Sequence, residues 1–244
     1  EGSVMKVRIK FRKQGAMKFI GHLDCMRFFQ KAIRRAKLDV AYSKGYSPHQ
    51  LMSFASPLGV GATSDGEYID VEFYSLPDIS LPELVAYLNQ FMTDEIFVTD
   101  IEIMPDGFKN SMSLLIAADY MVVEKEAGVF PENWQEKWLS FMEQQEIVIE
   151  KKTKKSVKEV DIKPHILAWD FSLASFAEKN GENYGTLHCD YEGNSLFMRL
   201  TSGSETNIKP ELVMQAFYAF CENELEPYSY QIHRMQIIFK KKGE

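Results

Sequence analysis

Few features of this sequence are typical of a disulfide scaffold or a membrane protein. The chain of 244 residues has three cysteines without CxxC spacing, which fits a reducing compartment better than a disulfide framework or a zinc site. No apolar run approaches the roughly 20 residues of a membrane helix, and no charged-then-apolar leader is present. We therefore expect a soluble, cytoplasmic protein that does not associate with a membrane.

Common motifs of catalysis and cofactor binding are also missing. Gly59-Val60-Gly61-Ala62 does not match GxGxxG, and the sequence has no GxxxxGK[ST], GxSxG or HExxH. His165, His188 and His233 lack metal-ligand spacing with each other or with a cysteine. We therefore predict no cofactor and no metal site.

Positive charge is in the minority but is concentrated. The formal net charge is −7, from 28 Lys and Arg against 35 Asp and Glu. Residues 1–50 hold twelve Lys and Arg against three acids, a net charge of +9, so the other 194 residues carry −16. Clustered cations attract polyanions, while the net negative charge keeps the molecule soluble. This segment predicts a locally bound anionic partner.

The first half shows the periodicities of a mixed fold. Apolar and basic residues alternate over residues 6–12, which predicts a strand with one apolar and one basic face. Apolar residues recur at helical spacing over residues 21–37. A strand at 68–73, a helix opened by the capping box Ser80-Leu81-Pro82-Glu83, and a strand at 96–104 follow. This order indicates a split β-α-β fold.

The second half repeats this theme. Pro210-Glu211-Leu212-Val213 opens a helix as Pro82-Glu83-Leu84-Val85 does. The expected elements are a strand at 114–124, a helix at 131–142, a hairpin of 187–190 and 195–200, a helix at 210–222 and a strand at 230–240. We predict an α+β protein of two tandem ferredoxin-like domains with antiparallel sheets. Residues 5–107 would form an N-terminal domain with a basic face, and residues 108–244 a C-terminal domain.

The basic strand and helix faces are the main candidates for a binding site. If the helix covers the apolar side of the sheet, the cations of the first strand form an open row about 7 Å apart. Tyr42 and the loop 43–49, which holds Lys44 and Tyr46, add a cation and aromatic rings that could stack on bases. The alternative is an ordinary solvated face balanced by acids elsewhere. The candidate nucleic-acid-binding residues are Lys6, Arg8, Lys10, Arg12, Arg27, Lys31, Arg34, Arg35, Lys44 and Tyr46.

Two histidines are candidates for catalysis. His22 at the start of the first helix and His49 in the following loop could supply a general acid and a general base for RNA cleavage through the 2′-hydroxyl. The alternative is that His22 only hydrogen-bonds at the helix start.

Several segments resemble the radical-SAM-linked protein family, an uncharacterised domain encoded beside a radical SAM protein or fused to its end. The matching segments are Lys6 to Lys13, Phe19 to Asp24, Ser43 to His49, Leu58 to Gly61, Val160 to Pro164 and Ile208 to Glu211. The resemblance implies a genetic link to a radical SAM enzyme and a role near RNA or ribosome metabolism. A radical SAM enzyme itself would need CxxxCxxC, which Cys25, Cys189 and Cys221 do not provide.

The leading functional hypothesis is therefore a non-catalytic accessory module. It would bind RNA, such as tRNA or rRNA, or present it as substrate to a radical SAM protein. The alternatives are a metal-independent RNA endonuclease using His22 and His49, and a protein-interaction scaffold that docks on a radical SAM partner. The order of elements also looks like that of the RNA-processing endonucleases of CRISPR systems, some of which use a histidine near the first helix.

Overall fold

The chain has a mixed α+β fold whose strands pair mostly antiparallel. The computed structural model describes residues 4–152 and 157–240. These residues form two compact units: unit 1 takes its residues from 4–115 and 236–240, and unit 2 from the described part of 116–235. The predicted domains 5–107 and 108–244 stay a prediction. None of the helices in the described ranges has the length and hydropathy needed to cross a membrane.

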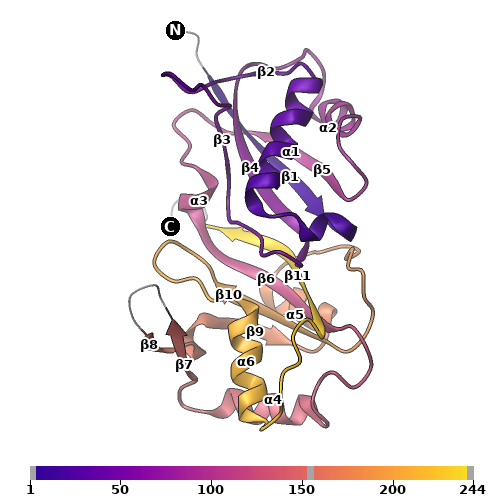
Figure 1. The fold of residues 1–244 in the computed structure, drawn as a ribbon, viewed down its shortest axis with the longest axis vertical. Coiled ribbons are helices and arrows are strands. Elements are labelled where there is room, and N and C mark those ends of the chain that lie inside the picture. Colours follow the sequence, from indigo (N-terminus) through magenta and orange to yellow (C-terminus); the bar gives the residue numbers. More distant parts are fainter. Residues whose placement is uncertain (1–3, 153–156, 241–244) are drawn as a thin grey trace. The chain divides into compact units, whose positions relative to one another are not determined.

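Unit 1 is built around three antiparallel strands in the order β5-β1-β4. The short strands β2 and β3 pair with β4, and α1 and α2 lie beside these strands in Figure 1. The elements are β1 (Met5–Lys13), η1 (Gly15–Phe19), α1 (His22–Arg35), β2 (Asp39–Val40), β3 (Met52–Phe54), β4 (Thr63–Ser75), α2 (Leu81–Asn89), β5 (Ile96–Ile103) and α3 (Ser111–Leu114).

The alternation of β1 gives unit 1 its core. Val7, Ile9 and Phe11 are each 1% exposed and belong to one apolar cluster with residues of α1 and α2. The rings of Phe11 and Phe29 meet edge-on with centroids 4.7 Å apart. Burying each such side chain contributes roughly 1.5–3 kcal/mol relative to exposure. The predicted apolar face of the strand is therefore confirmed.

The capping box at α2 is also confirmed. The Glu83 backbone N–H donates to Ser80 Oγ at 3.4 Å, and the Ser80 N–H donates to Glu83 Oε2 at 2.8 Å. The hydrogen bonds from Ser80 lower the pKa of the Glu83 carboxyl. These contacts satisfy backbone donors that the first turn of a helix leaves without partners.

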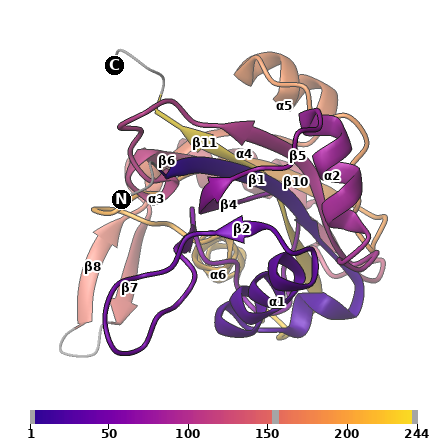
Figure 2. The ribbon, with the colours of Figure 1, turned by 90° about the horizontal axis from the view of Figure 1, so that it is seen from above.

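In the described part of unit 2 the strands have the order β11-β6-β10-β9, with β11 belonging to unit 2 up to Met235, and β7 and β8 form a separate hairpin. Figure 2 shows the ribbon from a second direction, with α6 seen nearly end-on. The elements are β6 (Leu115–Glu124), α4 (Trp134–Glu143), β7 (Val148–Lys152), β8 (Val157–Asp161), η2 (Lys163–His165), β9 (Ile166–Asp170), α5 (Leu173–Asn180), β10 (Ser195–Thr201), α6 (Pro210–Phe220) and β11 (Tyr230–Phe239).

The predicted hairpin of residues 187–190 and 195–200 is wrong. Strand β10 pairs with β9 instead, and residues 187–190 are irregular. Leu187 and Cys189 pack against a core cluster that includes Phe176 and Phe197. Their apolar character therefore reflects the burial of a loop rather than a strand.

On the face of β1 opposite the core, the side chain of Arg8 is buried. This side chain is 8% exposed, and its guanidinium lies over the rings of Phe239 at 4.3 Å and Phe108 at 5.0 Å. Its Nε lies 3.5 Å from Oδ1 of Asp70, which is also buried. The carboxylate of Asp70 in turn accepts hydrogen bonds from the N–H and Oγ of Ser111, both at 2.6 Å. A buried cation is thus matched by a carboxylate and two rings.

Removing Asp70 should destabilise unit 1 strongly. In Asp70→Ala the guanidinium of Arg8 stays buried without its counter-ion, so the free energy of unfolding should fall by about 3 kcal/mol. Urea unfolding followed by circular dichroism measures the change. Glu102→Ala is the control, because Glu102 pairs opposite Arg8 on β5 but is exposed. Equal unfolding midpoints for the two variants would refute the role of Asp70.

Candidate functional site

The outer face of α1 carries a row of exposed cations. Arg27, Lys31 and Arg34 follow one another at i, i+4 and i+7, so they share one helix face over about 10 Å. The opposite face is apolar and buried in the core of unit 1. Asp24 is the only acidic residue of α1, and it pairs with Arg27 at 3.0 Å. The face is therefore strongly positive beyond its first turn.

An open groove lies along the C-terminal part of α1. Its volume is about 590 Å³, and four exposed cations meet there with apolar side chains. Arg35 also donates to the backbone oxygen of Phe91 at 2.5 Å, which connects α1 to the segment after α2. The lining residues are Phe28, Lys31, Arg34, Arg35, Lys37, Met92 and Thr93.

The last cation of the groove stands where α1 ends. Lys37 has φ of 52°, a left-handed conformation that glycine adopts more easily than other residues. The Leu38 N–H donates to the Ile33 oxygen and the Lys37 N–H to the Arg34 oxygen, which closes the helix end. A lysine here costs roughly 1 kcal/mol relative to an unstrained residue. Lys37 is not among the predicted binding residues, although it follows the basic helix directly in the sequence.

The other predicted cations of β1 are partly covered as well. Lys6 donates to the Phe108 oxygen at 2.9 Å and to Asn110 Oδ1 at 2.6 Å. Lys10 lies over the ring of Tyr68, and Arg12 lies over Phe97 and forms an ion pair with Asp65 at 3.1 Å. The expected open row is therefore interrupted, with Arg8 withdrawn from solvent. The cations of β1 and those of α1 belong to opposite faces of the unit 1 strands.

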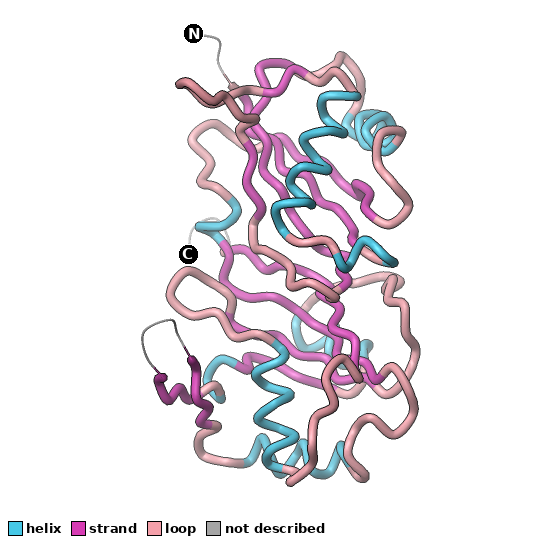
Figure 3. Tube along the Cα trace, in the orientation of Figure 1, coloured by secondary structure: helices cyan, strands magenta, loops and turns pink. Residues whose placement is uncertain are grey.

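The loop between β2 and β3 is exposed and closed at its base. The Ser43 N–H donates to the His49 oxygen at 2.8 Å, and the His49 N–H donates to Ser43 Oγ at 3.0 Å. Ser43 Oγ also lies 2.8 Å from Nδ1 of the His49 ring. Lys44 and Tyr46 are exposed at the tip. This loop is visible as a pink tube in Figure 3, where it joins two short strands.

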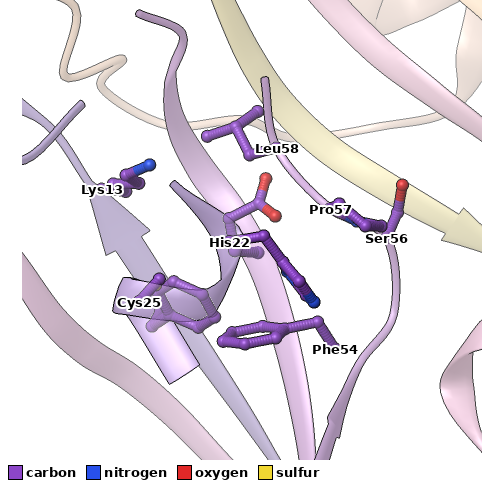
Figure 4. A pocket seen from close by; sticks show the side chains of 9 residues that line it. Lys13, His22, Cys25, Phe54, Ser56, Pro57 and Leu58 are labelled. Carbon is purple, nitrogen blue, oxygen red and sulfur yellow. The ribbon is translucent and has the colours of Figure 1, made fainter. Parts of the chain in front are cut away.

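His22 lies beside a small cavity of about 20 Å³, shown in Figure 4. The ring of His22 packs edge-on against Phe54 with centroids 5.0 Å apart. Lys13 is 3% exposed and donates to the backbone oxygen of Ile20 at 2.9 Å. Such a cavity can hold about one water molecule. It is therefore too small for a nucleotide.

The structure does not bring His22 and His49 together. Gln50, next to His49, donates from Nε2 to the oxygen of Gln30 at 3.2 Å, which places it beside the middle of α1. His22 begins the helix eight residues earlier, about 12 Å away along the axis. The ring of His49 is hydrogen-bonded within its own loop. The proposed acid and base pair therefore has no shared site in this structure.

Some residues that line the groove and the cavity were not predicted from the sequence. Lys37, Met92 and Thr93 line the groove, and no local pattern links the last two to α1. The buried pair of ionisable residues Lys13 and Glu67 lines the cavity. Within residues 4–152 and 157–240, no group of three or more His, Cys, Asp or Glu side chains is arranged to hold a metal ion.

Comparison with known proteins gives one family match. A family model described as "Uncharacterized protein conserved in bacteria (DUF2344)" matches residues 6–210. The match begins in β1 and reaches the first residue of α6. No curated protein matches the chain.

Cys25 should make stability depend on alkaline pH. Burial raises the pKa of its thiol from 9.0 to about 12, while Lys13 opposes the rise and Glu67 adds to it. The folded state keeps the thiol proton to higher pH than the unfolded chain does. The contribution of the protonated thiol to the free energy of unfolding is therefore complete below about pH 9 and is lost toward pH 12. Between pH 8 and 10.5, the free energy of unfolding should fall more for the wild type than for Cys25→Ser.

Urea unfolding at several pH values measures this difference. Cys221→Ser is the control, since Cys221 is less buried and should alter the pH dependence less. Parallel curves for the wild type and Cys25→Ser would contradict the expectation.

Proposed function

Because the chain belongs to the DUF2344 family of uncharacterized proteins conserved in bacteria, we propose its function from its surface: it is a non-catalytic module that binds RNA. The contact surface is the basic face of α1, defined by Arg27, Lys31, Arg34, Arg35 and Lys37. The observation that carries the proposal is the groove of about 590 Å³ in which four of these cations meet.

Three properties of this surface support polyanion binding over ordinary solvation. Solvated surfaces usually mix charges of both signs, yet α1 has one acid, Asp24, at its first turn. The spacing of Arg27, Lys31 and Arg34 fits several phosphates of one backbone rather than a single anion. The left-handed Lys37 keeps a positive charge where glycine would be less strained. Each property favours a partner with repeated negative charge.

We further propose that the RNA is presented to a radical SAM enzyme. The support is the resemblance of the segments around Lys6 to Lys13, Phe19 to Asp24 and Ser43 to His49 to the radical-SAM-linked proteins. In this proposal the partner supplies the chemistry and this chain supplies the RNA contact.

We also propose that both units are ferredoxin-like split β-α-β folds. In unit 1 the support is the order β5-β1-β4, with β2 and β3 paired to the far side of β4. In unit 2 it is the order β11-β6-β10-β9, with α5 and the hairpin of β7 and β8 as additions. The Pro-Glu-Leu-Val segments lie in the first turns of α2 and α6, which occupy equivalent places in the two orders.

RNA binding should depend on the cations of α1. In the double variant Lys31→Ala and Arg34→Ala, the affinity for a mixed cellular RNA pool should fall about tenfold or more at low salt. The slope of log affinity against log salt should fall by about one to two. Filter binding between 50 and 300 mM salt measures both. The matched control is Lys109→Ala with Lys209→Ala, which removes two exposed cations outside the groove.

A variant of Lys37 separates binding from folding. Lys37→Gly removes a groove cation and also relieves the left-handed backbone, so it should bind RNA more weakly while unfolding at equal or higher urea. Glu222→Gly relieves a comparable residue with φ of 53° after α6 and should leave RNA binding intact. Unchanged binding in Lys37→Gly and in the double variant would overturn the proposal, as would binding insensitive to salt.

The link to a radical SAM enzyme has a separate test. Affinity purification of the tagged protein from its native host, with and without ribonuclease, should recover a protein that carries CxxxCxxC. Recovery only without ribonuclease indicates that RNA connects the two, and recovery in both cases indicates a direct protein contact. Mass spectrometry that finds no such protein in either preparation would refute the partnership.

A further inference from the structure

We propose that this surface takes single-stranded RNA, whose unpaired bases stack on Tyr46 at the tip of the loop between β2 and β3. This inference rests on the proposed function and adds the substrate class. Cations alone would hold paired and unpaired strands, or any other polyanion. An exposed ring adds a contact that only a splayed base can make, because every base has a π-face.

Tyr46 is exposed as far as a side chain can be. Its ring is fully accessible, and the neighbouring Tyr42 is 44% exposed. Soluble proteins usually expose tyrosine only in part, with the apolar ring against other atoms. The adjoining Gly45 has φ of 118°, a backbone conformation that a residue with a side chain rarely adopts, and it forms the turn that presents the ring.

The loop that carries Tyr46 is held in place rather than free. Tyr42 and Gln50 form a β-bridge at its base. The next pair of residues, Ser43 and His49, is joined by three hydrogen-bond contacts. Fixing the ring before binding reduces the entropy that ordering it would cost on association. A braced aromatic tip is therefore suited to stacking.

The braced loop is anchored to the basic helix. The hydrogen bond from Gln50 Nε2 to the oxygen of Gln30 connects its base to the residue before Lys31. Tyr46 is three residues from His49, so it stays within about 10 Å of that base. A strand whose phosphates follow Arg27, Lys31 and Arg34 can therefore place a base on the ring. Phe28 and Met92 in the groove offer further apolar surface to unpaired bases.

The test compares two 12-nucleotide ligands of equal charge. One is an RNA of alternating adenosine and cytidine, which cannot pair with itself, and the other is the abasic ribose-phosphate chain. Fluorescence anisotropy should show the wild type binding the RNA roughly five- to 100-fold more tightly than the abasic chain. Tyr46→Ala should lose most of this preference, and Tyr46→Phe should keep it. Tyr228→Ala, which removes another exposed tyrosine, should behave as the wild type.

The outcomes separate this inference from the proposed function. Salt-dependent binding of both ligands with equal affinity, unchanged in Tyr46→Ala, would overturn base stacking and leave polyanion binding standing. Tighter binding of a 12-base-pair RNA duplex than of the single strand would also overturn it. Absence of binding to either ligand at low salt would overturn both. Since Tyr46 is fully exposed, its variants should fold, and circular dichroism checks that they do.

Discussion

Much of the packing in unit 1 depends on one constraint: the buried guanidinium of Arg8 needs partners. A strand with alternating apolar and basic residues must place cations on the side opposite its core, and Arg8 stands in the middle of that side. The structure matches it with Asp70 from β4 and with the rings of Phe108 and Phe239. Leaving such a charge buried without a partner would cost several kcal/mol. These partners close a face that would otherwise be a basic surface.

With Arg8 buried and its neighbours partly covered, α1 carries the row of exposed cations of unit 1. Its cations are under the opposite constraint, because they stand in solvent and α1 itself has one acid, Asp24. Arg34 and Arg35 occupy the last turn, where positive charge interacts favourably with the helix dipole, by roughly 0.3–1 kcal/mol each. The same side chains therefore stabilise the helix and create its positive potential. A bound polyanion would compete with the helix dipole for these two side chains, and would offset only a part of the stabilisation that they give the helix.

Local periodicity was sufficient to predict much of unit 1. The alternation over residues 6–12 and the helical spacing over residues 21–37 correspond to β1 and α1, and the capping box correctly marked the start of α2. Periodicity identifies two faces of a strand but does not say what covers each. Arg8 meets its partners only through contacts distant in sequence, 62 residues away for Asp70. The open row of cations could not be corrected without the tertiary fold.

The candidate site was predicted unevenly for the same reason. The cations of α1 could be named from one helical repeat, whereas Met92 and Thr93 reach the groove from another segment of the chain. His22 and His49 looked like a pair because both are titratable and near in sequence. The pairing of Gln50 with Gln30 separates them along the helix. In unit 2, β9 and α5 were missed, and the apolar segment 187–190 was mistaken for a strand although its side chains fill a core from a loop.

The contact of Phe239 with Arg8 has a consequence for synthesis on the ribosome. Residues 236–239 belong to unit 1 although β1 is made at the other end of the chain. At about 5–20 residues per second, roughly 10 to 50 s separate the translation of Arg8 from that of Phe239. During this interval Arg8 has Asp70 and Phe108 but lacks its second ring, and Tyr68 lacks the contacts of Gln236 and Phe239. The surroundings of Arg8 and Tyr68 in unit 1 are therefore completed only when the last strand, β11, has been made.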